Sequence, residues 1–138
     1  MRNKISIAFA VLALLLVSFA CSFGGGEPTL SNARASFDSD GKQISSTFGA
    51  SDTVYVVADL ENAVSGNKVV ADWYAENADG VDPNYKFDTV DYTITEDAFD
   101  GIVYFSRLPP DGGWPVGTYR VELLFNGTLS ATVTFTIQ

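Results

Sequence analysis

The clearest pattern in the chain is the alternation of apolar and polar residues near its C-terminus. Apolar side chains occupy every second position from Tyr119 to Phe125 and again from Leu129 to Ile137, and mostly Thr, Ser, Arg and Glu lie between them. A period of two predicts half-buried β-strands. The pair Asn126-Gly127 separates the two segments, and it favours the positive φ that a tight hairpin turn needs at both central positions. We therefore predict an antiparallel hairpin.

Earlier segments show the same pattern less strictly. One face of a strand over residues 53–60 carries Val54, Val56, Ala58 and Leu60, and one face of a strand over residues 68–76 carries Val69, Ala71 and Trp73. Further strands are predicted over residues 89–95 and 101–108, with an opening strand over 33–38 that continues around 43–48. We expect Trp73 in the core, about seven short strands and no amphipathic helix, which favours an all-β antiparallel sandwich.

Residues 111–121 read Asp-Gly-Gly-Trp-Pro-Val-Gly-Thr-Tyr-Arg-Val. The Gly-x-Tyr-x-Val part resembles the tyrosine corner of immunoglobulin-like domains, in which a cysteine follows the tyrosine. Val121 stands in place of that cysteine, and Val56 or Ala58 stands where its partner would be. The resemblance implies an immunoglobulin-like sandwich that is held together by packing without a disulfide.

Residues 45–138 as a whole resemble a recurrent type of bacterial exported immunoglobulin-like lipoprotein domain. The resemblance is carried by the strand Asp52 to Val56, by Gly113 to Leu123, by the Asn126-Gly127 hairpin and by the ending Thr134-Phe135-Thr136. These motifs imply a fold family, and a fold alone implies no activity.

The start of the chain predicts export. Basic Arg2 and Lys4 precede an uncharged, largely apolar run over residues 5–20, which is longer than the roughly 7–15 residues of most signal peptides and shorter than the roughly 18–20 that span a bilayer. Ser18-Phe19-Ala20-Cys21 resembles the bacterial lipobox, in which the chain is cut before a cysteine that carries a diacylglyceryl group, although Ser18 and Phe19 depart from the usual residues. Cleavage by the ordinary signal peptidase, or an uncleaved membrane helix, are the alternatives.

These patterns divide the chain into three parts. We expect a lipoprotein signal peptide at residues 1–20, the lipidated Cys21 with a flexible Gly-rich tether over residues 21–32, and the sandwich domain over residues 33–138. The lipid would anchor the domain to the cell membrane or the outer membrane, facing the periplasm or the cell exterior. Growth of cells with labelled palmitate would reveal the lipid on Cys21.

Charge and missing residues limit the possible functions. The chain has 8 basic and 17 acidic residues, and loss of Arg2 and Lys4 would change its net charge from −9 to −11. Such a charge repels phosphate backbones, so we expect no nucleic-acid partner. Histidine is absent and the single cysteine is assigned to lipid, which removes Ser-His and Cys-His nucleophiles and the commonest zinc ligands. We therefore expect no enzyme activity and no cofactor; a carboxylate-based glycosidase is the remaining enzymatic alternative.

Two loops and two aromatic residues are candidate binding sites. Calcium prefers oxygen ligands, and Asp38 with Asp40, or Asp79 with Asp82, could supply them, although an ordinary turn explains each loop more simply. Sugars and peptides dock on flat rings, for which Trp114 and Tyr74 are the first candidates, followed by Tyr85, Tyr92 and Phe105. Trp114 could instead cap the bottom of the sandwich.

The sequence thus predicts a lipid-anchored, non-enzymatic immunoglobulin-like module outside the cytoplasm. It would work as a binding or structural module by contacting a protein or an envelope polymer through strand edges and loops. The alternative is a carbohydrate-binding or calcium-dependent adhesion module, which would have a defined small ligand.

Overall fold

The computed structural model describes residues 26–138, so Cys21 and the predicted signal peptide lie outside the described residues. Residues 26–138 form eight strands and contain no helix, and hence none that could cross a bilayer. The strands are β1 (Thr29–Ser36), β2 (Thr47–Phe48), β3 (Val54–Ala63), β4 (Lys68–Ala78), β5 (Tyr85–Thr93), β6 (Phe99–Arg107), β7 (Gly117–Phe125) and β8 (Thr128–Ile137). The predicted all-β class is confirmed.

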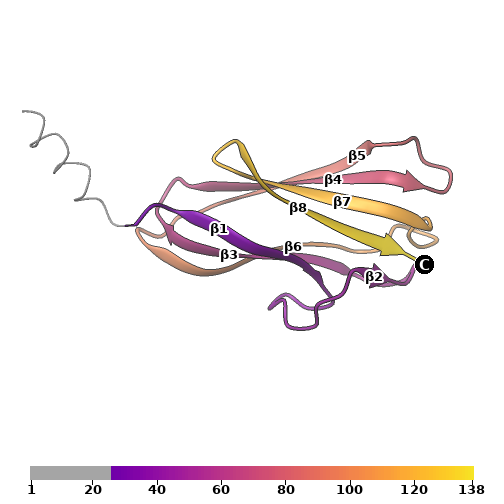
Figure 1. The fold of residues 1–138 in the computed structure, drawn as a ribbon, viewed down its shortest axis with the longest axis horizontal. Coiled ribbons are helices and arrows are strands. Elements are labelled where there is room, and N and C mark those ends of the chain that lie inside the picture. Colours follow the sequence, from indigo (N-terminus) through magenta and orange to yellow (C-terminus); the bar gives the residue numbers. More distant parts are fainter. Residues whose placement is uncertain (1–25) are drawn as a thin grey trace, which may run out of the picture.

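The strands form two sheets that lie on one another as two layers (Figure 1). The smaller sheet has the order β1-β3-β6 and the larger has the order β2-β8-β7-β4-β5. Every paired strand is antiparallel to its neighbour except β2, which runs parallel to β8. The segment around residues 43–48, predicted as a continuation of the opening strand, instead crosses to the other sheet and forms β2.

The core lies between the two sheets and uses the predicted faces. On β3 the side chains of Val54, Val56, Ala58 and Leu60 are at most 1% exposed, and on β4 those of Val69, Ala71 and Trp73 are fully buried. The predicted strand faces and the core position of Trp73 are thus confirmed. Each large apolar side chain buried in this way contributes about 1.5–3 kcal/mol to folding.

Five aromatic residues fill one end of this core. This aromatic cluster consists of Trp73, Phe87, Trp114, Tyr119 and Phe135. The rings of Tyr119 and Phe135 are stacked at 5.2 Å, and the ring of Trp114 meets Tyr119 edge-on at 5.5 Å. Edge-on and offset arrangements are the favourable ones for aromatic pairs. Because the chain has one cysteine, no disulfide within it assists this packing.

The loop from β6 to β7 is fixed around the start of β7. The Tyr119 hydroxyl donates a hydrogen bond of 2.6 Å to the carbonyl of Pro115, the backbone contact that a tyrosine corner makes. Trp114 Nε1 donates to the carbonyl of Asp52 at 2.9 Å and so ties this loop to the segment before β3. At Gly117 a Cβ would lie 2.2 Å from the carbonyl oxygen of Asn77. Only glycine therefore allows β7 to start so close to the end of β4.

The predicted C-terminal hairpin is confirmed. Asn126 and Gly127 have φ of 50° and 85°, and β7 pairs with β8 on either side of them. The Asn126 side-chain oxygen also accepts a hydrogen bond of 2.9 Å from the amide of Lys68. The turn is therefore attached to the neighbouring strand β4.

Two strands begin four residues earlier than expected, and each contains an irregularity. β1 begins at Thr29 instead of residue 33, so the segment predicted as tether is partly strand; its ladder with β3 shifts near Asn32, which has a φ of 52°. β5 covers Tyr85–Thr93 instead of residues 89–95, and its ladder with β4 shifts around Phe87. Each shift breaks the period of two on which the sequence prediction depends.

We predict that Tyr119→Phe destabilises the domain by about 1 kcal/mol, because it removes one partly buried hydrogen bond while keeping the ring. Urea unfolding of the full chain in detergent measures the change. Tyr104→Phe is the matched control, since Tyr104 is 53% exposed and should leave the unfolding midpoint unchanged. Equal midpoints for Tyr119→Phe and the native chain would contradict the role of this hydrogen bond.

Candidate functional site

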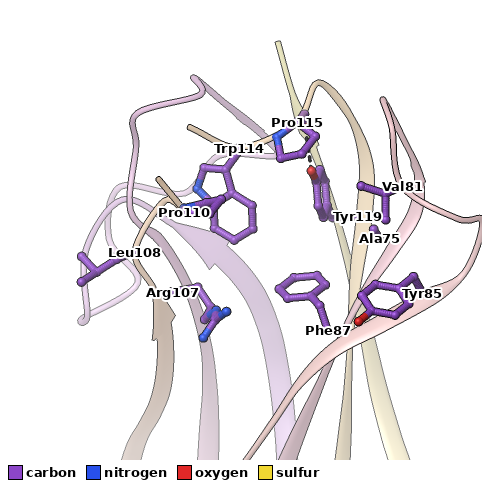
Figure 2. A pocket seen from close by; sticks show the side chains of 10 residues that line it. All are labelled: Ala75, Val81, Tyr85, Phe87, Arg107, Leu108, Pro110, Trp114, Pro115 and Tyr119. Carbon is purple, nitrogen blue, oxygen red and sulfur yellow. Dashed lines mark hydrogen bonds between the residues drawn. The ribbon is translucent and has the colours of Figure 1, made fainter. Parts of the chain in front are cut away.

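A pocket of about 230 Å³ opens beside the aromatic cluster, at the end of the sandwich where β5 starts and β6 ends. Figure 2 shows the side chains of Phe87, Trp114 and Tyr119 facing its interior. Tyr85 and Leu108, which are 54% and 74% exposed, lie at its opening. Its remaining lining residues are Ala75, Val81, Arg107, Pro110 and Pro115. The lining is thus mainly aromatic and aliphatic.

Strand register explains why these side chains converge. Tyr85 lies opposite Ala75, which is buried, so both point to the inner side of the larger sheet. Arg107 lies opposite the fully buried Val54 and points to the inner side of the smaller sheet. The pocket therefore lies between inward-facing residues of the two outermost strands β5 and β6, at the side of the sandwich where both sheets end.

Arg107 is the one charged residue that lines the pocket. Its Nη1 lies 2.9 Å from Oδ2 of Asp88, and its guanidinium carbon is 5.6 Å from the centre of the Phe87 ring. Its Nε is buried and has no hydrogen-bond partner within residues 26–138. A guanidinium carries five N–H donors, so one ion pair leaves donors free for a further acceptor.

The other polar atoms of the pocket are largely engaged. The Tyr119 hydroxyl donates to Pro115 and the Trp114 indole donates to Asp52. Burial raises the pKa of Tyr119, and the negative charge of Asp79 raises it further, so this hydroxyl remains protonated and keeps its hydrogen bond. A ligand would therefore find mainly apolar surface, the Tyr85 side chain and the guanidinium of Arg107.

The two aromatic candidates from the sequence occupy covered positions. Trp114 is 5% exposed and forms part of the pocket floor. It therefore caps the core, which was the alternative to a ligand-contact role for this residue. Tyr74 lies on the opposite side of the larger sheet, where the guanidinium of Arg120 sits 4.0 Å from its ring centre and Lys86 lies 5.8 Å away. The structure therefore does not bring Trp114 and Tyr74 together.

Of the three further aromatics, two are accessible. Tyr85 lines the pocket opening and Tyr92 is 43% exposed, whereas Phe105 is 5% exposed and belongs to the core. Tyr85 and Tyr92 both lie on β5, one near each end of it. Among these three candidates, the accessible aromatic surface is thus on β5.

Asp38, Asp40, Asp79 and Asp82 do not belong to a cluster of metal-ligating side chains. Within residues 26–138, no three His, Cys, Asp or Glu side chains come close enough to hold a metal ion together. Asp38 instead accepts hydrogen bonds from the Ser36 hydroxyl and from the amides of Lys42 and Gln43. Its carboxylate stabilises the turn after β1.

Arg107 was not among the candidates from the sequence. In the strand predicted over residues 101–108, Val103, Phe105 and Arg107 share one phase of the alternation, and Val103 and Phe105 are buried. A charged residue at an inward-facing position departs from binary patterning unless it has a function. The inward-facing position of Arg107 in this alternation could have identified it from the sequence.

Comparison with known proteins gives a likeness of fold only. No protein-family model and no curated protein matches the chain. The alkylpurine DNA glycosylase AlkC of Pseudomonas fluorescens, bound to DNA containing an abasic site analog, superposes on 83% of this chain with 13% identity and a TM-score of 0.51. A β-glucosidase from Listeria innocua, in complex with glucose, superposes on 80% with 10% identity and a TM-score of 0.48. The chain covers 31% of the glycosylase and 16% of the glucosidase.

We predict that Asp38→Asn changes the acid sensitivity of the domain. The hydrogen bond from Ser36 lowers the pKa of Asp38, partial desolvation opposes this, and the amides of Gln43 and Lys42 lower it further. A lowered pKa in the folded state stabilises the fold above the ordinary value of about 3.9, and this contribution is lost as the pH falls from that value through the lowered pKa of the folded state.

Urea unfolding midpoints at about pH 6 and about pH 3 should therefore differ less in Asp38→Asn than in the native chain. Asp40→Asn is the matched control, because Asp40 is an exposed neighbour on the same turn, and it should behave like the native chain. An unchanged pH dependence in Asp38→Asn would show that the turn does not need the charge.

Proposed function

We propose that this chain is an exported, lipid-anchored and non-enzymatic immunoglobulin-like module that binds part of a protein or envelope polymer in the pocket between β5 and β6. The observation that carries the proposal is the pocket itself, an open and mainly apolar cavity with one cation, Arg107, on an acidic chain. A largely preformed apolar pocket with a few convergent polar groups is the usual form of a binding site.

The immunoglobulin-like assignment is supported by topology and by two residues. The smaller sheet combines the first, third and sixth strands, and the larger combines the fourth, fifth, seventh and eighth with the short β2. Trp73 is buried between the sheets on the strand after β3, and Tyr119 makes the hydrogen bond of a tyrosine corner. These are hallmarks of immunoglobulin-like sandwiches.

The position of the pocket also suits a module anchored at its N-terminus. Thr29 pairs with Glu61 near the end of β3, whereas Arg107 pairs with Val54 at its start. The two positions are seven residues apart along β3, a distance of about 23 Å at about 3.3 Å per residue. In Figure 1, β1 starts at one end of the sandwich and β8 ends at the other. The pocket would therefore point away from the anchor.

The lining of the pocket supports binding in preference to catalysis. Its polar side chains are those of Arg107, Tyr85, Trp114 and Tyr119, and the last two already donate to backbone carbonyls. No carboxylate lines the pocket, so a glycosidase acid and base would have to come from elsewhere.

We predict that a photo-crosslinking side chain at Leu108 captures a partner in intact cells, because Leu108 lies at the pocket opening. The same side chain at Leu129 is the matched control, since Leu129 is 54% exposed but lies next to the β7–β8 turn. A discrete crosslinked product at Leu108 alone, lost on Tyr85→Ala, is the expected result. Equal products at both positions, or none at Leu108, would count against a pocket-bound partner.

The anchor is tested separately. Cells grown with labelled palmitate should label the native chain, and Cys21→Ser should remove the label because Cys21 is the only thiol. Cys21→Ser should also release the domain from the membrane fraction. A label that survives the substitution would disprove lipidation at Cys21, while leaving the crosslinking result at Leu108 unaffected.

A further inference from the structure

β5 is an edge strand along its whole length. It is the last strand of the larger sheet, pairs with β4 on one side, and has no strand on its other side within residues 26–138. Every second N–H and C=O along such an edge points outward without a partner in the sheet. An extended peptide can satisfy these groups by adding a further strand, a recurrent mode of peptide recognition.

The inner side of β5 carries exposed apolar side chains beside this edge. Tyr85, Val90 and Tyr92 are 54%, 36% and 43% exposed. Their partners on β4 are Ala75, Ala71 and Val69, which are all buried in the core, so the three side chains face the same way as the core. They remain exposed because β6 is the last strand of the opposite sheet. Together we call these three residues the β5 apolar row.

The pocket continues this row at the start of β5, since Tyr85 belongs to both. Charges along the strand would not oppose an incoming chain, because each is paired: Lys86 with Asp72 at 3.8 Å, Asp88 with Arg107 at 2.9 Å and Asp91 with Lys68 at 3.7 Å. The row and the pocket thus lie on the same side of β5, with the Asp88–Arg107 ion pair between Tyr85 and Val90, beside an edge on which the Thr89 amide donates to Asp88 Oδ1.

The size and the polar groups of the pocket limit the kind of chemical group that it can bind. A volume of about 230 Å³ lies below the roughly 300–1,000 Å³ of pockets that enclose a drug-sized ligand, so the pocket suits a single side chain better than a larger group. A sugar would bury several hydroxyls against a lining whose Trp114 and Tyr119 donors are already used, and unpaired buried polar groups are costly. Arg107, in contrast, has free donors and a positive charge suited to a carboxylate.

We propose, building on the function proposed above, that the β5 edge and the pocket bind the C-terminal segment of a partner polypeptide. The segment adds as a strand antiparallel to β5. Because β5 begins at the pocket, a chain running in the opposite direction arrives there with its C-terminus. Its apolar last side chain fills the pocket, its α-carboxylate pairs with Arg107, and earlier side chains of the same phase lie on the β5 apolar row.

The test uses the full chain in detergent and fluorescein-labelled hexapeptides with alternating Thr and Val. The last residue is Leu, Val, Phe, Gly or Asp, and each peptide is made as the free acid and as the C-terminal amide. Fluorescence anisotropy should show saturable binding of free acids that end in Leu, Val or Phe, with roughly tenfold or greater weakening in the amides, since a hydrogen-bonded ion pair is lost.

Variants of the protein test whether Arg107 recognises the α-carboxylate of the peptide. Arg107→Met should bind acids and amides equally weakly, whereas Asp88→Asn, which leaves Arg107 charged, should keep the preference for acids. Lys42→Met is the matched control, because it removes a positive charge from an exposed loop outside the pocket, and it should bind like the native chain. Melting temperatures show that each variant is folded.

Backbone pairing is tested by N-methylation of alternate amides in the peptide. Methyl groups on the amides that face β5 should abolish binding, and methyl groups on the other alternate set should not. Equal effects of both sets would overturn strand addition to β5.

Three results would overturn the proposal as a whole. The first is the absence of binding by any free acid, the second is equal binding of acids and amides to the native chain, and the third is displacement of the acids by dodecanoate or by a glycan at lower concentration. If the peptides fail while a partner still crosslinks at Leu108, the proposed function stands and only the peptide assignment is lost. If both experiments fail, the pocket is not a binding site.

Discussion

The hydrogen bond from Tyr119 to the carbonyl of Pro115 holds the loop on which this end of the molecule depends. The loop connects β6 of the smaller sheet to β7 of the larger one, and it places Trp114 in a buried position at the end of the core. Trp114 in turn donates to Asp52, just before β3. In a sandwich without a disulfide, the packing of Trp114 in the aromatic cluster and its hydrogen bond to Asp52 connect the larger sheet to the start of the smaller one.

Trp114 and Tyr119 also form the floor of the pocket, and this limits which pocket residues can be substituted without a loss of stability. Trp114 and Tyr119 belong to both core and pocket, so their substitution would change stability together with the binding proposed for the pocket. Tyr85, Arg107 and Leu108 lie toward the opening and are partly exposed. They can change with little cost to the fold, so in the proposed binding function the rim would set the specificity while folding fixes the floor.

The sequence predicted the parts of the fold that depend on local pattern. The hairpin at Asn126-Gly127 and the buried faces of β3 and β4 follow from turn chemistry and a period of two. The bounds of β1 and β5 did not follow, because ladder shifts near Asn32 and Phe87 interrupt that period. The pocket depends on which strands end each sheet, and this pairing is tertiary information. The sequence could therefore offer Trp114 and Tyr74 together as ring candidates, although they lie on opposite sides of the larger sheet.

The opposite placement of the N-terminal end of β1 and the pocket has a mechanical consequence. A force applied between Thr29 and the pocket runs parallel to the strands, because Thr29 pairs with the far end of β3 and Arg107 with its near end. The backbone hydrogen bonds of the β1–β3 ladder then carry the load in shear, together, instead of opening one after another. A tethered module that is pulled by a partner bound in this pocket would therefore resist extension in the direction of its strands.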